Sequence, residues 1–137
     1  MRIASVMLAA VIIMASGCKR NVVIKSSLAP EPSARTAVNI EPLQTALRRA
    51  ANAQEIYYSN PANRYTYASD ASRLGITLPD GVTLTILEAT SKGWAGMTRY
   101  GSDGPGCVIY IAQVSKTPVT PGGTSASREG VLACDRS

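Results

Sequence analysis

Residues 43–60, LQTALRRAANAQEIYYSN, decide the fold of this chain. Read at 3.6 residues per turn, the stretch places small and apolar side chains on one face and most of its polar side chains elsewhere. The apolar face consists of Leu43, Ala46, Leu47, Ala50, Gln54 and Tyr57. Because this face is narrow and rich in alanine, a twisted sheet can approach the helix axis closely. The stretch therefore predicts an amphipathic helix that packs on a sheet.

Both ends of this helix carry local signals. Asn39 is the predicted N-cap, and Glu41 and Pro42 then fall in the first turn. A carboxylate there favours the helix dipole, and proline lacks only a donor that is already unpaired. The sequence Asn60-Pro61 ends the helix, because proline disfavours the helical conformation of the residue before it.

Four later stretches have the pattern of β-strands. A strong turn signal, PDG at residues 79–81, precedes residues 82–90, in which Val, Leu and Ile alternate with threonine. The other strands are predicted at residues 93–100, 107–113 and 130–134. Short polar turns between the first three strands favour antiparallel pairing of neighbours. The predicted fold class is therefore α+β, with one helix on a four-stranded antiparallel sheet.

Composition argues against catalysis. The chain has 137 residues, enough for one domain with appendages, and contains no histidine. Histidine is the commonest general base and the commonest neutral metal ligand. The sequence also lacks a GxSxG nucleophile motif, a Walker loop, a dinucleotide fingerprint and a carboxylate-rich calcium loop. We expect no enzyme activity, no cofactor and no metal.

The charge distribution argues against a nucleic-acid partner. Residues 18–39 contain four basic residues and one acidic residue, whereas residues 40–137 contain nine basic and eight acidic residues. A nucleic-acid domain carries its basic excess on the fold itself. The basic excess of this chain lies mainly before the predicted domain.

The N-terminus has the three parts of an export signal. Arg2 is followed by an apolar run over residues 3–14 and by small residues at 15–17. This run of twelve residues is too short to cross a bilayer, which needs about 20. We therefore predict that residues 1–17 are a cleaved signal peptide and that the protein is exported.

The cleavage site favours a lipid anchor. Residues 15–18, Ala-Ser-Gly-Cys, resemble a bacterial lipobox, in which the cysteine receives a lipid and becomes the mature N-terminus. This predicts lipidation of Cys18; the alternative is an ordinary secretory cleavage beside a stray cysteine. Lys19 in the second mature position is typical of outer-membrane or surface lipoproteins. Residues 18–39, which contain Pro30 and Pro32, are then a flexible tether, and residues 40–137 form the head.

Cys107 and Cys134 are the two cysteines of the predicted head, and both lie at strand ends. Outside the cytosol such a pair is most simply a disulfide. By the loop-entropy model this bond would contribute about 3 to 4 kcal/mol. Two thiols without histidine are too few to form a zinc site.

The order of these segments resembles the C-terminal head of type IV pilin-like proteins and of the related type II secretion pseudopilins. The resemblance covers about residues 43–135 and is carried by AQEIYYSN, DASRLG, PDGVTLTI, GWAG, CVIYI and GVLACD, in that order. It implies a helix on a four-stranded antiparallel sheet. It also implies a disulfide that ties down the C-terminal region, here matching Cys107 and Cys134.

The N-terminus departs from that family. Members that polymerise have a Gly-Phe type peptidase site and then a long hydrophobic helix, with a glutamate at the fifth position of the mature chain. Here Gly17 is followed by Cys-Lys-Arg-Asn-Val, and no apolar run of about 20 residues comes after it. The sequence therefore predicts a single head on a lipid anchor, monomeric and without the helix that builds a filament.

The candidate site residues lie around the predicted helix exit. Tyr57, Tyr58, Tyr65 and Tyr67 form either an exposed aromatic patch for a partner or a set of pins between loop and helix. Asp70 and Arg73 form either an ion pair or a solvated turn. The predicted function is a non-catalytic, lipid-anchored envelope protein that binds another envelope protein. The alternative is a small-ligand-binding or accessory lipoprotein of an envelope complex, which would need a well-formed apolar pocket.

Overall fold

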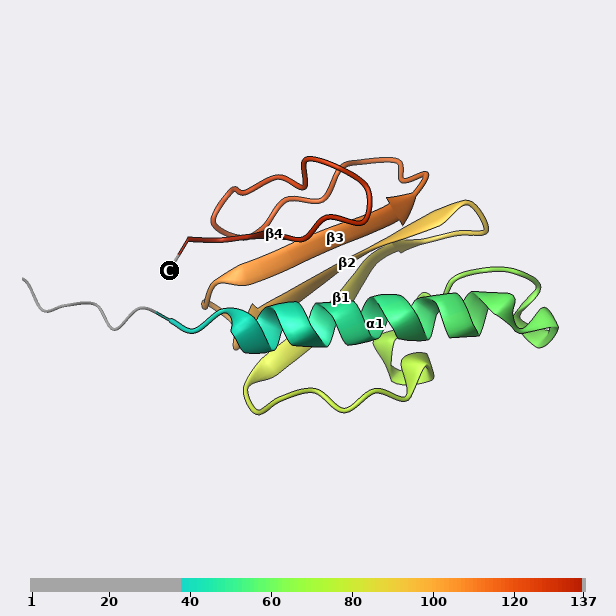
Figure 1. Cartoon of the computed structure of the whole chain (residues 1–137), viewed down its shortest axis with the longest axis horizontal. Coiled ribbons are helices and arrows are strands. Elements are labelled where there is room, and N and C mark those ends of the chain that lie inside the picture. The colour runs from blue at the N-terminus through green and yellow to red at the C-terminus, as the bar shows by residue number, and fades with distance from the viewer. Residues whose placement is uncertain (1–37, 137) are drawn as a thin grey trace, which may run out of the picture. The chain divides into compact units, whose positions relative to one another are not determined.

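One helix lies across one face of a four-stranded antiparallel sheet in the computed structural model, which describes residues 38–136 (Figure 1). The elements are the helix α1 Glu41–Ser59, the 3-10 helices η1 Pro61–Asn63 and η2 Ala71–Leu74, and the strands β1 Val82–Ala89, β2 Gly93–Tyr100, β3 Gly106–Ala112 and β4 Ala133–Cys134. The predicted α+β class is confirmed. The predicted signal peptide, Cys18 and the tether up to residue 37 lie outside the described residues.

The helix α1 includes Glu41 and Pro42 in its first turn, as predicted, and ends at Ser59, directly before Asn60-Pro61. Its N-cap is Ile40, so the prediction of Asn39 as N-cap is wrong by one residue. The Asn39 side chain still pairs with one of the free N–H groups of the first turn, because its Oδ1 accepts a hydrogen bond from the Glu41 N–H at 3.0 Å. At the other end Asn60 is extended, with ψ of 116°, as expected before proline.

The face of α1 that packs on the sheet is the predicted one. Five of its six predicted members are buried, namely Leu43, Ala46, Leu47, Ala50 and Gln54. Tyr57, the sixth, is only partly buried, because its hydroxyl reaches the surface and contacts Arg73. The small residues in this stripe let the helix approach the sheet.

Trp94 supplies much of the bulk beneath the helix. It is fully buried and belongs to the same cluster as Leu43 and Leu47. Gly96 makes room for the ring, since a Cβ at this position would lie 2.6 Å from the Trp94 Cζ3. Trp94 Nε1 is the one buried side-chain nitrogen or oxygen without a hydrogen-bond partner in the described part of the chain. The indole thus fills the core mainly by its volume, in a chain without phenylalanine.

The first three strands pair in the predicted consecutive order and β4 lies beside β3, which gives the order β1-β2-β3-β4 with all pairs antiparallel. The first two strands have one register shift, between Ile86 and Glu88. The last strand contains only two of the five residues predicted at 130–134. Gly130 has a φ of 71°, and its N–H donates to the Tyr110 carbonyl from a turn, so the strand cannot begin there.

The long loop after β3 covers the face of the sheet that points away from α1. Side chains alternate along a strand, so Ala95 and Val108 point away from the helix, and both are at most 1% exposed. The loop buries three of its own residues, Pro118, Thr120 and Ala126. The sequence predicted only a loop here, because its covering role depends on contacts with strands that are distant along the chain.

Candidate interaction surface

The chain leaves α1 through a turn with two successive residues in the left-handed backbone region. The Asn60 side chain caps η1, and the Asn63 side chain donates to the Tyr57 carbonyl at 2.8 Å. Arg64 and Tyr65 then have φ values of 55° and 54°. Residues other than glycine rarely adopt this conformation, and such strain is concentrated at functional sites. The turn directs the following segment back along the helix.

This turn brings together three of the four predicted tyrosines. The rings of Tyr58 and Tyr67 are stacked, with centroids 4.5 Å apart and an interplanar angle of 26°. Tyr65 meets Tyr58 edge to face, with centroids 6.2 Å apart, and remains 54% exposed. We call Tyr58, Tyr65 and Tyr67 the tyrosine surface. Aromatic pairs of this geometry contribute about 0.5 to 1.5 kcal/mol beyond their buried area, so the rings are held in place.

Two hydroxyls of the tyrosine surface fix it to neighbouring elements. The Tyr67 hydroxyl donates to Glu55 Oε1 at 3.1 Å, and the Tyr58 hydroxyl donates to the Ser91 carbonyl at 3.4 Å. Burial, and then the negative charge of Glu55, raise the pKa of Tyr67 to about 12. The Tyr67 hydroxyl therefore stays protonated and remains a donor. These contacts match the pinning role that the sequence left open, whereas the exposed Tyr65 ring leaves a surface for a partner.

The fourth tyrosine, Tyr57, lies apart from the tyrosine surface. Its hydroxyl accepts a hydrogen bond from Arg73 Nη1 at 3.2 Å. The ion pair considered between Asp70 and Arg73 does not form. Instead Asp70 caps η2 by accepting from the Ser72 N–H at 2.8 Å, and the hydrogen bonds from Ser72 lower the pKa of the Asp70 carboxyl. The alternative of a turn without this ion pair is the one observed.

Gln54 anchors the returning segment from inside the core. Its Nε2 donates to the Ala68 carbonyl at 2.8 Å, and its Oε1 accepts from the Ala68 N–H at 2.7 Å. Sequence reasoning placed Gln54 on the buried face but did not find this contact. The available signal was its polarity, because a buried amide needs hydrogen-bond partners. Nothing in the sequence indicates that the partner is Ala68, which lies 14 residues further along the chain.

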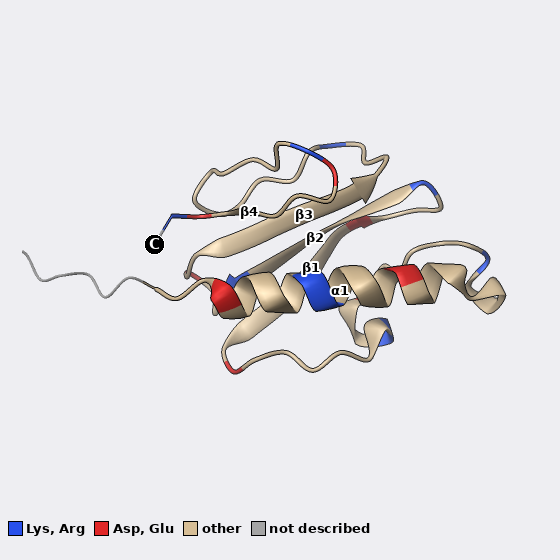
Figure 2. Cartoon of the chain, in the orientation of Figure 1, with Lys and Arg blue, Asp and Glu red and all other residues tan. Residues whose placement is uncertain are grey.

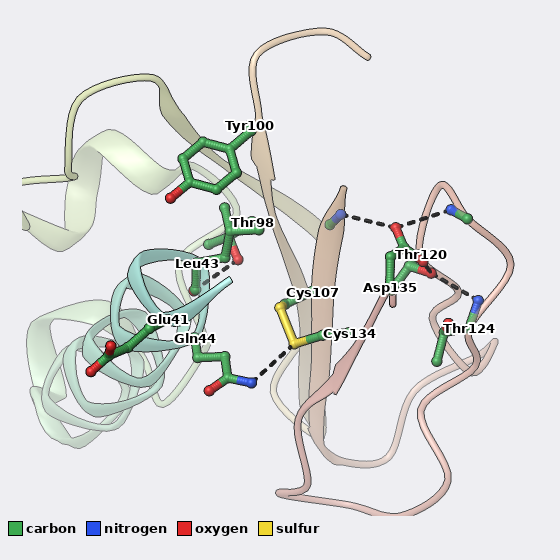
Figure 3. The surroundings of a disulfide bond; sticks show 12 residues. Glu41, Leu43, Gln44, Thr98, Tyr100, Cys107, Thr120, Thr124, Cys134 and Asp135 are labelled. Atoms are coloured by element: carbon green, nitrogen blue, oxygen red, sulfur yellow. Dashed lines mark hydrogen bonds between the residues drawn. A yellow bond between two sulfur atoms is a disulfide. The ribbon is translucent and has the colours of Figure 1, made fainter. Parts of the chain in front are cut away.

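A second polar network, also missed by the sequence, holds the C-terminal end (Figure 3). The buried Asp135 carboxylate accepts hydrogen bonds from the Thr120 hydroxyl and from the N–H groups of Gly106 and Gly122, the latter two at 2.9 and 3.1 Å. Burial by itself would raise the pKa of Asp135, but these hydrogen bonds outweigh it and lower the pKa. The carboxylate organises the loop from within and offers no open reactive group.

Cys107 and Cys134 lie beside this network and form a disulfide (Figure 3). They are directly opposite each other in the pairing of β3 with β4, with Cα atoms 4.0 Å apart. Gln44 Nε2 lies 3.6 Å from Cys134 Sγ, so the bond sits against the first turns of α1. The two-residue strand β4 is thereby attached covalently to the sheet.

The remaining surface of residues 38–136 mixes charges of both signs and carries several open hollows. Basic and acidic side chains are scattered over the helix, the loops and the strand ends (Figure 2). The main hollows are open to solvent, with volumes of about 230 to 470 Å³. One of about 320 Å³ lies between Leu87, Ala95 and Val119 on the sheet face away from α1.

Comparison of the chain with protein-family models, with curated proteins and with solved structures finds no match. Among the described residues, no group of three His, Cys, Asp or Glu side chains is placed to hold a metal ion. No helix in the same part of the chain is long and apolar enough to cross a membrane. The tyrosine surface combines ordered ring contacts with one exposed ring, Tyr65.

Proposed function

We propose that this chain is a non-catalytic, lipid-anchored envelope protein whose pilin-like head binds another envelope protein through the tyrosine surface. Tyr65 carries the proposal. Its ring is 54% exposed although the turn beneath it uses a strained backbone conformation to place it against Tyr58. Tyrosine is enriched at protein interfaces, where a ring that is already ordered loses little entropy on binding.

The proposed lipid anchor rests on the sequence alone. The proposed pilin-like character rests on the sequence together with the topology. A helix on a four-stranded antiparallel sheet, with a disulfide near the C-terminus, agrees with the resemblance to pilin-like heads. The residues before Cys18 support lipidation, and Lys19 supports an outer-membrane or surface location. In this proposal the tether holds a single head away from the membrane and the head acts as an accessory module.

Site-specific photocrosslinking in intact cells tests the proposed surface. A benzophenone amino acid at position 65 should capture one defined envelope protein, because the ring at this position contacts the partner directly. The same probe at Val131, which is 39% exposed in the C-terminal loop, is the matched control. Equal capture at both positions, or no capture at position 65, would refute the tyrosine surface as the interface.

A pair of substitutions separates the ring from the turn that holds it. Tyr65→Asn removes the ring, and asparagine tolerates the left-handed conformation. Arg64→Asn makes the same exchange at the neighbouring left-handed position and leaves the ring in place. We expect Tyr65→Asn to weaken binding of the captured partner by about fivefold or more, as for an interface residue worth at least 1 kcal/mol, and Arg64→Asn to have little effect.

A further inference from the structure

A second surface lies on the outer side of α1, away from the tyrosine surface. Arg49, Ala53 and Ile56 follow each other at spacings of four and three residues and so lie on one side of the helix. Leu74 and Ile76, at the end of η2 and just after it, lie beside this stripe. Together they line a hollow of about 470 Å³, and a smaller hollow continues past Tyr57 and Arg73. We call this continuous depression the arginine groove.

Ile56 is the unusual residue of the groove. It is 72% exposed, more than any other large hydrophobic residue in the described part of the chain. Its position in the helix is opposite the buried stripe, so it adds nothing to the core. Leu74 and Ile76 are partly buried and form the wall facing it. The groove therefore presents apolar side chains to solvent from two different elements.

The groove has a basic residue at each end and no acidic residue in its lining. Arg49 lines the larger hollow and Arg73 lines the smaller one. Neither guanidinium has a carboxylate within ion-pair distance among residues 38–136. Arg73 is held toward the groove by its hydrogen bond to the Tyr57 hydroxyl. Asp70, the carboxylate nearest to Arg73 along the chain, accepts the Ser72 N–H through Oδ1 and forms no ion pair with Arg73.

We infer that the arginine groove binds a peptide segment of a partner protein in which carboxylates flank an apolar residue. The apolar side chain packs between Ile56 and Leu74, and the carboxylates pair with the two arginines. The tether of this chain has the wrong charge, with four basic residues and one acidic residue in 18–39. A flat anionic membrane fits less well, because the head is nearly neutral and the two arginines enclose an apolar depression.

Nuclear magnetic resonance of the mature chain with Cys18→Ser tests this binding mode. The probe is the peptide Gly-Glu-Asp-Leu-Ile-Asp-Glu-Gly, and its matched control replaces each acid by the corresponding amide. We expect the acidic peptide to shift the backbone amide signals of Ile56 and Leu74, and the neutral peptide to bind at least about fivefold more weakly. Added salt should weaken binding of the acidic peptide, because salt screens the attraction between exposed charges.

Variants locate the charges. Arg49→Gln and Arg73→Gln should each lower the affinity for the acidic peptide by about two- to fivefold, which is the range for exposed ion pairs. Arg48→Gln is the control and should change nothing, because Arg48 is also exposed but does not line the groove. Ile56→Ser should also weaken binding, while the unchanged remainder of the spectrum reports an intact fold.

Three results would overturn the inference. They are no shift at the groove at millimolar peptide, equal shifts with the neutral peptide, and shifts produced by phosphatidylglycerol vesicles but not by the peptide. The last result would assign the groove to a membrane surface. Because the groove shares no residue with the tyrosine surface, failure here would leave the photocrosslinking result at position 65 unaffected.

Discussion

The side-chain amide of Gln54 pairs with the backbone of Ala68 in both directions, with hydrogen bonds of 2.8 and 2.7 Å. Both residues are buried, at 0% and 1% exposure. The contact joins the core face of α1 to the segment that follows the left-handed turn at Arg64 and Tyr65. It therefore links the packing of the helix to the placement of Tyr67, the residue directly before Ala68.

Replacing Gln54 by methionine should destabilise the head by about 2 to 4 kcal/mol. The volume is nearly conserved, but the Ala68 N–H and carbonyl lose their partners, and a buried unsatisfied group costs about 1 to 3 kcal/mol. Urea unfolding measures the change. Asn52→Ala, an exposed amide on the same helix, should have a much smaller effect, and similar losses in both variants would argue against a special role for the Gln54 contact.

Reduction of the Cys107–Cys134 bond should release the C-terminal strand. The two cysteines are 27 positions apart, so the loop-entropy model assigns the bond about 3 to 4 kcal/mol. β4 contains two residues and cannot hold itself by pairing alone. Mass spectrometry of the protein purified without reductant should find no free thiol in the head. The double variant Cys107→Ala/Cys134→Ala should unfold at a lower urea concentration. Two free thiols would contradict the pairing.

Asp135 should make stability depend on pH in the acid range. Its pKa is lowered in the folded head, so its carboxylate stabilises the fold above the unfolded pKa of about 4. That contribution is lost as the pH falls through the folded pKa. Asp135→Asn should cost about 1 to 3 kcal/mol at neutral pH, the scale of hydrogen bonds to a charged group. The difference in the free energy of unfolding between Asp135→Asn and the wild type should shrink below about pH 4.

Asp80→Asn is the matched control for that experiment. Asp80 is exposed, and its carboxylate accepts no hydrogen bond in the structure. The stability of Asp80→Asn should therefore vary with pH as that of the wild type does. A constant difference between wild type and Asp135→Asn from neutral to acid pH would show that shape, and not charge, explains the role of Asp135.

Lipidation at Cys18 should decide where the protein resides. Residues 15–18 resemble a lipobox, and more than one acyl chain holds a protein firmly, since each buried methylene contributes about 0.8 kcal/mol. Cys18→Ser should therefore move the protein from the membrane fraction to the soluble exported fraction. A Cys18→Ser protein that stays in the membrane fraction would disprove the lipid anchor.

The chain with Cys18→Ser, which cannot carry the proposed lipid, should be monomeric. Residues 18–39 include Lys19, Arg20, Lys25 and Arg35, and burying such charges unpaired costs several kcal/mol each. They therefore cannot replace the apolar helix that pilin-like subunits stack in a filament. Sedimentation of the Cys18→Ser protein at micromolar concentration should give a single monomeric species. Ordered fibres in electron micrographs would show that the head carries its own assembly contacts.

Much of the fold follows from patterns that are local in the sequence. The spacing of Leu43, Ala46 and Leu47 selects one face of a helix, and Asn60-Pro61 ends it. Alternation of apolar residues and threonine after residue 81 predicts a strand, and short turns favour pairing with the next strand. These signals act between residues a few positions apart, where backbone geometry fixes which side chains share a face.

Tertiary structure decided the features that join distant segments. The partner of Gln54, the loop that covers the second face of the sheet and the hydrogen bonds of Asp135 each depend on where another segment lies. The sequence marked four tyrosines but did not determine that three would meet and that Tyr57 would turn toward Arg73. A hydrogen bond or aromatic contact needs atoms a few ångströms apart in space, and periodicity along the chain does not specify that distance.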